Sequence, residues 1–122
     1  MLLEVVVEIV RHDKGACAVL YITGRLDLAG GTMLKEQVKK LLASNTVSIH
    51  LNLNSVDFIN SSGLGALVST MKEIRLARGR LTMSNLASYV QEIFDITQLS
   101  HIFEIFKTEE EALSSYRATA TV

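Results

Sequence analysis

The sequence predicts a single α/β domain in which a mixed β-sheet of four to five strands is covered by about four α-helices. Residues 47–54 alternate apolar and polar side chains, which is the period of a strand with one buried face. Residues 64–75 carry an apolar stripe at helical spacing. Two strand-like segments precede this pair, and helical and strand-like segments alternate after it. That order is typical of a mixed sheet with helices packed on its faces.

The first two strands are predicted as a hairpin. Residues 3–10 and 16–23 are rich in β-branched and other apolar residues, and the polar residues 11–15 predict the turn between them. A loop containing Gly30-Gly31 should follow, and after it a surface helix. The apolar face of this helix is made by Leu34, Val38, Leu41 and Leu42.

The helix that carries the 64–75 stripe is the best formed in the chain. It should end near Arg78-Gly79, because basic residues and a glycine are typical of a helix C-terminus. Strands are then predicted at residues 80–84 and 101–106, on either side of a helix at residues 86–96.

A last helix should begin after Thr108. Glu111 lies three residues further on, and this spacing makes a capping box in which each residue satisfies a backbone N–H of the other. We expect the domain to cover residues 1–116 and residues 117–122 to form a frayed tail.

Composition excludes several classes of protein. At 122 residues the chain suits one domain, and its 48% hydrophobic and 20% charged residues exclude a mainly disordered chain. The net charge is only −1, so we expect no binding to nucleic acid. No apolar run is long enough to span a membrane, and the first ten residues, interrupted by Glu4 and Glu8, do not resemble a signal peptide. We therefore expect a cytoplasmic protein without direct membrane insertion.

Cysteine and histidine give no sign of a metal or cofactor site. Cys17, the single cysteine, lies in an apolar strand and is predicted to be a buried small hydrophobe. His12 lies in a predicted turn, His50 on the polar face of a strand and His101 at the start of another. Their separation lacks metal-ligand spacing, so we expect them to be structural or solvent-facing.

The polar and glycine-rich stretch INSSGLGAL, residues 59–67, lies between a predicted strand and a predicted helix. Asn60 and Ser61 or Ser62 suit the role of helix N-cap, because a helix N-terminus leaves about four backbone N–H groups without partners. Capping does not explain Gly63 and Gly65, each of which costs about 0.5–1 kcal/mol of helix propensity. Their missing side chains would let a partner backbone or a phosphate approach the serines.

A phosphoryl group on one of these serines would be tolerated by the fold. It would add about −1.5 to −2 charges at a place where free N–H groups and the positive end of the helix dipole favour an anion. In an interface with another protein the same charge would have to be desolvated without a counter-ion. The hydroxyl therefore suits a switch for protein binding.

The residues of this region resemble a known family. The stretch DFINSSGLGALVSTMKEI, residues 57–74, is similar to the phosphorylation-site region of bacterial anti-sigma factor antagonists, the small single-domain members of the STAS family. The usual form there is Asp-Ser-Ser-Gly-Leu-Gly or Asp-Ser-Thr-Gly-Leu-Gly. Residues 23–27, TGRLD, resemble the family's Gly-Glu-Leu-Asp stretch, and residues 51–58 resemble its central strand and exit. The order of elements agrees over about residues 4–115, which implies a STAS-like domain.

The resemblance implies a protein-binding switch and no enzyme. Family members that are not phosphorylated bind an anti-sigma factor, often one with serine kinase activity, and so release the sigma factor. The kinase, using ATP and magnesium, phosphorylates a serine of the motif, and a PP2C-type phosphatase can reverse this. By position, Ser62 is the leading acceptor and Ser61 the second candidate. The family's Asp is replaced by Asn60, which keeps the capping ability and removes a negative charge beside the acceptor.

The resemblance and the spacing along the predicted helix together indicate which residues face the partner. Asp27 matches an acidic residue that lies near the acceptor in the family, although from the chain alone it reads as a polar cap for the first helix. Besides Asn60, Ser61 and Ser62, the expected partner-binding residues are Gly63, Ala66, Thr70 and Glu73. The last three are expected there because they lie away from the apolar stripe of their helix, and the usual alternative for such positions is a solvated face with no partner.

Two other functions are alternatives to this one. An enzyme would use Ser61 or Ser62 as a nucleophile, but the chain has no Gly-x-Ser-x-Gly elbow. A non-switching STAS subunit, such as the accessory protein of a lipid-transport ABC complex or a stress-signalling scaffold, would bind a partner without a phosphorylatable hydroxyl.

Overall fold

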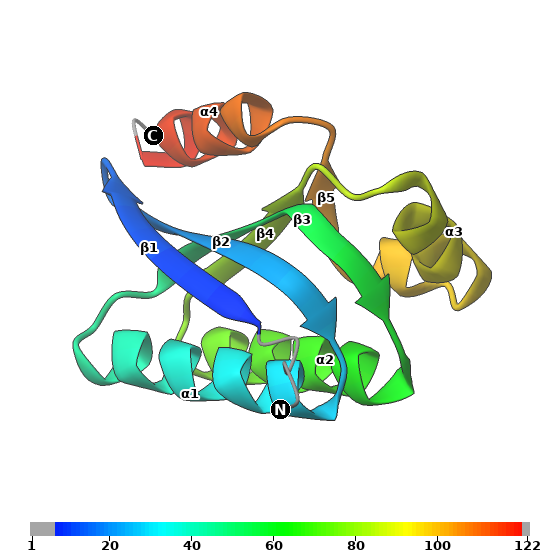
Figure 1. The fold of residues 1–122 in the computed structure, drawn as a ribbon. Helices are drawn as coiled ribbons and strands as arrows, with labels where there is room; N and C mark the ends of the chain where they lie inside the picture. The colour runs from blue at the N-terminus through cyan, green and yellow to red at the C-terminus, as the bar shows by residue number, and fades with distance from the viewer. Residues whose placement is uncertain (1–6, 121–122) are drawn as a thin grey trace.

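Five strands form one mixed sheet in the order β1-β2-β3-β4-β5 (Figure 1). The computed structural model describes residues 7–120, and the side chains of residues 7–117. Strands β1 and β2 pair antiparallel, and each later strand pairs parallel to the one before it. The strands are β1 (Glu8–Lys14), β2 (Cys17–Leu26), β3 (Ser48–Ile59), β4 (Arg80–Ser84) and β5 (Glu104–Phe106).

Helices cover both faces of the sheet. Helices α1 and α2 are the crossovers that make β2, β3 and β4 parallel, and they lie side by side on one face (Figure 1). Helix α4 lies on the opposite face, and α3 contacts β3 and a short 3₁₀ turn, η1. The bounds are α1 (Leu28–Ala43), α2 (Ser61–Leu76), α3 (Ser88–Ile96), η1 (Leu99–His101) and α4 (Glu109–Ala120).

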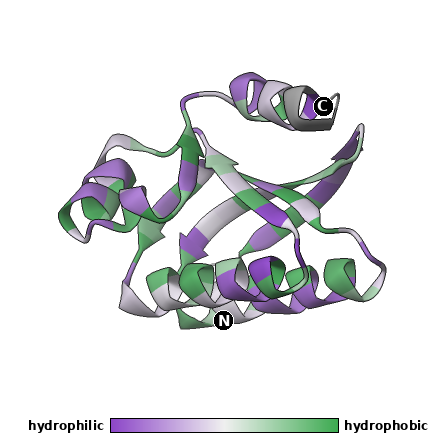
Figure 2. Ribbon diagram, turned by 180° about the vertical axis from the view of Figure 1, so that it is seen from behind, coloured by the Kyte–Doolittle hydropathy of each residue, from purple (hydrophilic) through white to green (hydrophobic). Residues whose placement is uncertain are grey.

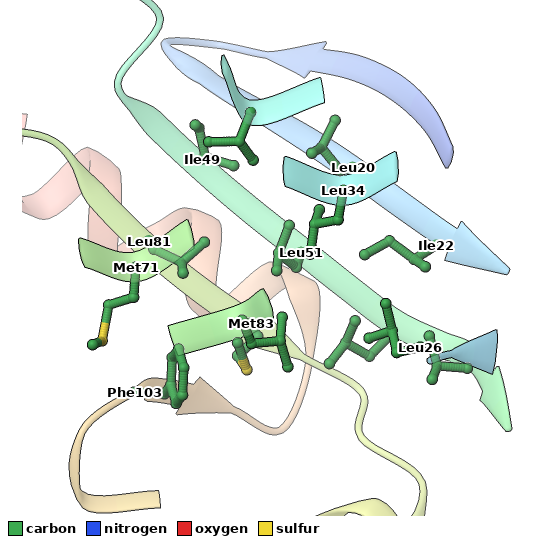
Figure 3. Packing of buried hydrophobic residues seen from close by; sticks show 14 of the residues in the cluster. Leu20, Ile22, Leu26, Leu34, Ile49, Leu51, Met71, Leu81, Met83 and Phe103 are labelled. Atoms are coloured by element: carbon green, nitrogen blue, oxygen red, sulfur yellow. The ribbon is translucent and has the colours of Figure 1, made fainter. Parts of the chain in front are cut away.

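The main hydrophobic core fills the space between the sheet and the α1–α2 layer. Leu20 and Leu51 of the sheet and Leu34 of α1 are fully buried there (Figure 3). The ribbons of α1 and α2 carry both hydrophobic and hydrophilic stretches, as expected of helices with one buried face (Figure 2). The same core holds the end of β3 and the start of α2 in place.

The structure confirms the predicted fold class, with five strands and four α-helices among the described residues. The predicted strand at residues 80–84 coincides with β4. The capping box is also present, since Glu111 N donates to Thr108 Oγ1 at 3.2 Å and Thr108 N to Glu111 Oε1 at 3.4 Å.

Several predicted boundaries were wrong. Strand β1 continues to Lys14, so the hairpin turn is shorter than residues 11–15, while residues 3–6 lie outside the described part of the chain. Gly30 and Gly31 belong to α1 and not to a loop. Of the predicted strand at residues 101–106, only Glu104–Phe106 is a strand.

The predicted domain end also falls within regular structure. Helix α4 continues to Ala120, so a boundary after residue 116 would divide a helix. Residues 121 and 122 lie outside the described part of the chain.

Candidate functional site

Two helix N-termini lie next to each other at the carboxyl end of the parallel strands. In the pairing of β2 with β3, Leu26 is opposite Ile59. Asp27 and Asn60 follow these two residues and act as N-caps of α1 and α2. The Asn60 N–H donates to the Leu26 carbonyl at 3.3 Å, which joins the two helix starts directly.

Both caps use the same hydrogen bond. Asp27 Oδ1 accepts from Gly30 N at 3.0 Å, and Asn60 Oδ1 accepts from Gly63 N, also at 3.0 Å. The Gly30 N–H is the main reason that the pKa of the Asp27 carboxyl lies below its ordinary value, with a smaller contribution from Arg25. Asp27 is therefore a capping residue, as its place in the chain predicted.

Ser61 and Ser62 are the first two residues of α2, and both are exposed. Asn60 supplies the cap, and the described part of the chain contains no partner for either serine hydroxyl. Capping was one predicted role for a serine at this position. Asn60 fills that role, so neither serine is needed as the cap. Both hydroxyls are open to a reagent from solvent.

The two glycines of the motif have different roles. A Cβ placed on Gly63 would lie 1.8 Å from the Leu26 carbonyl oxygen, so this position is closed by the chain itself. A Cβ placed on Gly65 would meet nothing within 4 Å. The prediction that Gly63 offers a partner close access was wrong, because its face is already occupied by β2. Only Gly65 lies beside open space.

Two further residues expected to face a partner are buried. Ala66 is 6% exposed and Thr70 is 1% exposed, because α1 packs on this side of α2. A Cβ placed on Gly31 of α1 would lie 2.6 Å from the Ala66 Cβ. Glu73 is exposed at the edge of a groove of about 410 Å³ between the two helices.

An arginine beside the caps was not predicted from the sequence. The Arg25 guanidinium stacks at 3.8 Å over the Phe58 ring, and its Nε lies 3.6 Å from Asp27 Oδ2. Tyr89 of α3 lies near this pair: burial raises the pKa of its hydroxyl, Asp57 adds to the rise and Arg25 opposes it. Arg25 lies opposite Phe58 in the pairing of β2 with β3, so a prediction of this pairing would have identified the cluster.

His50 is buried, with no exposed surface, rather than solvent-facing. Its strand face is polar as predicted, but α4 covers that face. Cys17 is buried, as expected. Within residues 7–120 no group of three or more His, Cys, Asp or Glu side chains could hold a metal ion. No helix in this part of the chain is long and apolar enough to cross a membrane.

Comparison with known proteins identifies the family. The model of the STAS domain family matches residues 8–112. The anti-sigma-B factor antagonist of Bacillus subtilis is 32% identical over 89 residues, which cover 73% of this chain and 81% of that protein.

Solved structures share the fold. An anti-sigma factor antagonist from Mycobacterium paratuberculosis superposes with a TM-score of 0.81 at 20% identity, covering 91% of this chain and 94% of that one. The Bacillus cell fate determinant SpoIIAA in its phosphorylated form gives a TM-score of 0.69 at 21% identity, covering 89% and 99%. Anti-sigma factor antagonists are regulatory binding proteins and not enzymes. The chain belongs to the STAS domain family, in the group of the anti-sigma factor antagonists.

Proposed function

We propose that this protein binds an anti-sigma factor while Ser62 is unmodified, and that phosphorylation of Ser62 ends the binding. The observation that carries the proposal is the pair of exposed serine hydroxyls at the start of α2, neither of which is needed to cap the helix. Ser61 is the second candidate. The name of the Bacillus subtilis relative supports an anti-sigma factor as the partner, and the phosphorylated form of SpoIIAA supports control by phosphate.

The partner-facing surface consists of the exposed groups around the two caps. In this proposal they are the exposed Ser61 and Ser62 and the half-buried caps Asp27 and Asn60, and the exposed Glu73 extends the surface along α2. The surface also rests on three buried residues of α2, which are Gly63, Ala66 and Thr70. The anti-sigma factor in this proposal has serine kinase activity, a PP2C-type phosphatase restores the hydroxyl, and all three proteins act in the cytoplasm.

The charges around Ser62 allow the fold to accommodate a phosphate. The same phosphate would oppose the binding of a partner. The first N–H groups of α2 and its dipole face the added charge, and Asn60 places no carboxylate next to it. Asp27 is held by Gly30 and Arg25, so it keeps its place when the charge changes. A docked partner would have to bury the same phosphate, which is unfavourable without a counter-ion.

Mass spectrometry of the protein from its own host tests which residue is modified. We expect phosphate on Ser62, its loss in Ser62→Ala, and its retention in Ser88→Ala. Ser88 is a matched control, because it is an exposed serine in the first position of another helix, α3. Phosphate on neither Ser61 nor Ser62 under any growth condition, together with transport subunits as partners, would replace this proposal with a non-switching accessory subunit.

A further inference from the structure

Helix α4 is held on the sheet mainly by polar groups. At its start, Glu109 accepts hydrogen bonds from Lys14 Nζ at 2.7 Å, from Tyr21 Oη at 2.9 Å and from Asn52 Nδ2 at 2.9 Å. In the part of α4 whose side chains are described, Ala112 is the only fully buried apolar residue. By contrast, α1 and α2 are held by large apolar side chains. Elements with little buried apolar area open at lower cost than the core.

The other end of α4 is fixed by Tyr116. Its hydroxyl donates to the carbonyl oxygen of Ile49 at 2.9 Å or of Arg80 at 3.1 Å, and lies 3.0 Å from Thr82 Oγ1. The Arg80 guanidinium lies 4.5 Å from the Tyr116 ring centre. Tyr116 therefore reaches the backbone of the two central strands, β3 and β4.

A buried histidine lies directly behind this contact. His50 Nδ1 is 2.7 Å from Thr82 Oγ1, and His50 Nε2 is 2.7 Å from Ser84 Oγ. All three side chains are without exposed surface. A chain of hydrogen bonds thus runs from Ser84 through His50 and Thr82 to Tyr116 of α4.

The number of available hydrogen atoms determines which group donates in each of these hydrogen bonds. Carbonyl oxygens only accept, so the Tyr116 hydroxyl gives its hydrogen to one of them and must accept from Thr82. Thr82 then has no hydrogen left for His50. His50 Nδ1 must therefore carry a hydrogen and donate it to Thr82 Oγ1, and its Nε2 must accept from the Ser84 hydroxyl.

Proton uptake at His50 Nε2 would break this order. The new N–H would face the Ser84 hydroxyl hydrogen, and Ser84 has no access to water in which to find another acceptor. The imidazolium would also be a buried charge. Exposure of His50 to water removes both penalties, and α4 is the element that covers this face of the sheet.

We propose that α4 is an acid-released cover, detached from the sheet when His50 takes up a proton, while the α1–α2 layer stays folded. Burial lowers the pKa of His50 to about 4. The charge of Glu109 opposes this decrease in pKa, and the charge of Lys14 adds to it. Cys17, Arg80 and Tyr116 also lie beside this network. Glu104 lies opposite Thr82 on β5 and pairs with Arg80, Tyr21 donates to Glu109, and the His12 ring contacts the Tyr21 ring. Because the folded pKa lies below the value of about 6.5 in water, α4 docking is at full strength above pH 6.5 and weakens as the pH falls toward 4.

Cys17 is a built-in reporter of this motion. It is 3% exposed and lies against Tyr116, and burial raises the pKa of its thiol to about 11. It is the single cysteine of the chain, so labelling by 4,4′-dithiodipyridine reports opening at this site alone. The labelling rate of Cys17 is divided by the labelling rate of a free thiol at the same pH. This ratio corrects for the effect of pH on the labelling reaction itself.

The test is the pH dependence of this relative rate. Between pH 7 and pH 5 we expect a rise of about 20-fold, the ratio of opening constants that the two pKa values of His50 require. His50→Gln should remove the rise. His101→Gln should keep it, because His101 is exposed. Glu109→Gln should raise the rate at both pH values, because it weakens the hydrogen bonds that hold the start of α4, and the rise should persist because His50 is retained.

A rate that does not change with pH, or a rise that survives in His50→Gln, would overturn the proposal. The proposal would also be overturned if low denaturant concentrations increased the labelling rate at pH 5 as steeply as they increase global unfolding. In that case α4 would not open by itself. If His50→Gln does not fold, nuclear magnetic resonance of the unaltered protein decides. The His50 ring must titrate near pH 4 to 5 together with loss of amide protection in α4, and loss spread equally over α2 would contradict local release.

Discussion

At the start of α2, capping and exposure belong to different side chains. Asn60 accepts the hydrogen bond from Gly63 N, and Ser61 and Ser62 stay exposed. If a serine had been the cap, phosphorylation would have changed the group that accepts the capping hydrogen bond. With Asn60 as the cap, the hydroxyls can change their chemical state while the helix start is retained.

The two glycines of the motif lead to opposite expectations. Gly63→Ala should destabilise the protein by more than about 3 kcal/mol, because its Cβ would overlap the Leu26 carbonyl oxygen of β2. Gly65→Ala should instead stabilise it by about 0.5–1 kcal/mol, since alanine favours the helix and meets nothing within 4 Å. Urea unfolding of both variants measures the difference. Equal stabilities would contradict the close packing of α2 on β2.

Part of the site could be predicted from residues alone. Propensity is enough to assign Asp27 and Asn60 to helix caps, since such side chains bind local backbone N–H groups. The role of Gly63 could not be predicted, because its constraint comes from Leu26, which is distant in sequence and near only in the folded sheet. The Arg25–Phe58 stack has the same origin in strand pairing.

At the level of elements, α1 and α2 approach closely through small residues. Gly31 lies where any Cβ would be 2.6 Å from the Ala66 Cβ and 3.7 Å from the Ser62 carbonyl oxygen. The contact explains why Ala66 is buried although helical spacing placed it away from the apolar stripe. It also connects the backbone of Ser62 with the first turn of α1.

Gly31→Ala should therefore cost about 1–3 kcal/mol in unfolding free energy, because the two helices must move apart. Ala66→Gly alone should cost about 1 kcal/mol through helix propensity. The double variant moves the small residue to the other helix, so its cost should be below the sum by about 1 kcal/mol or more. Additive costs in this double-mutant cycle would show that the contact does not limit the approach of the helices.

Strand and helix types could be predicted from periodicity, and their cover could not. The alternation in residues 47–54 placed His50 on the polar face of its strand, and this is correct. A period of two says which face a side chain is on, and it does not say what packs there. Helix α4 buries this face through Glu109 and Tyr116, whose partners lie in strands far away in the sequence.

At the level of the whole molecule, the two faces of the sheet differ in how they are held. The face under α1 and α2 is apolar and fixes the positions of the two helix starts. The face under α4 is polar and contains the His50 network. The serines lie at the carboxyl end of the parallel strands, next to the α1–α2 layer. In the proposed switch, a phosphate on Ser62 would therefore alter the surface and not the fold.

The most direct test of the central claim is a titration of the anti-sigma factor from the same host with two forms of the chain. One form is unmodified, and the other carries phosphoserine introduced at position 62 during synthesis, so that no kinase is needed. We predict that the unmodified chain binds and that the phosphorylated chain binds at least about 100-fold more weakly, because the phosphate must be desolvated in the interface. Equal affinity of the two forms, or no binding of the unmodified chain, would contradict the account.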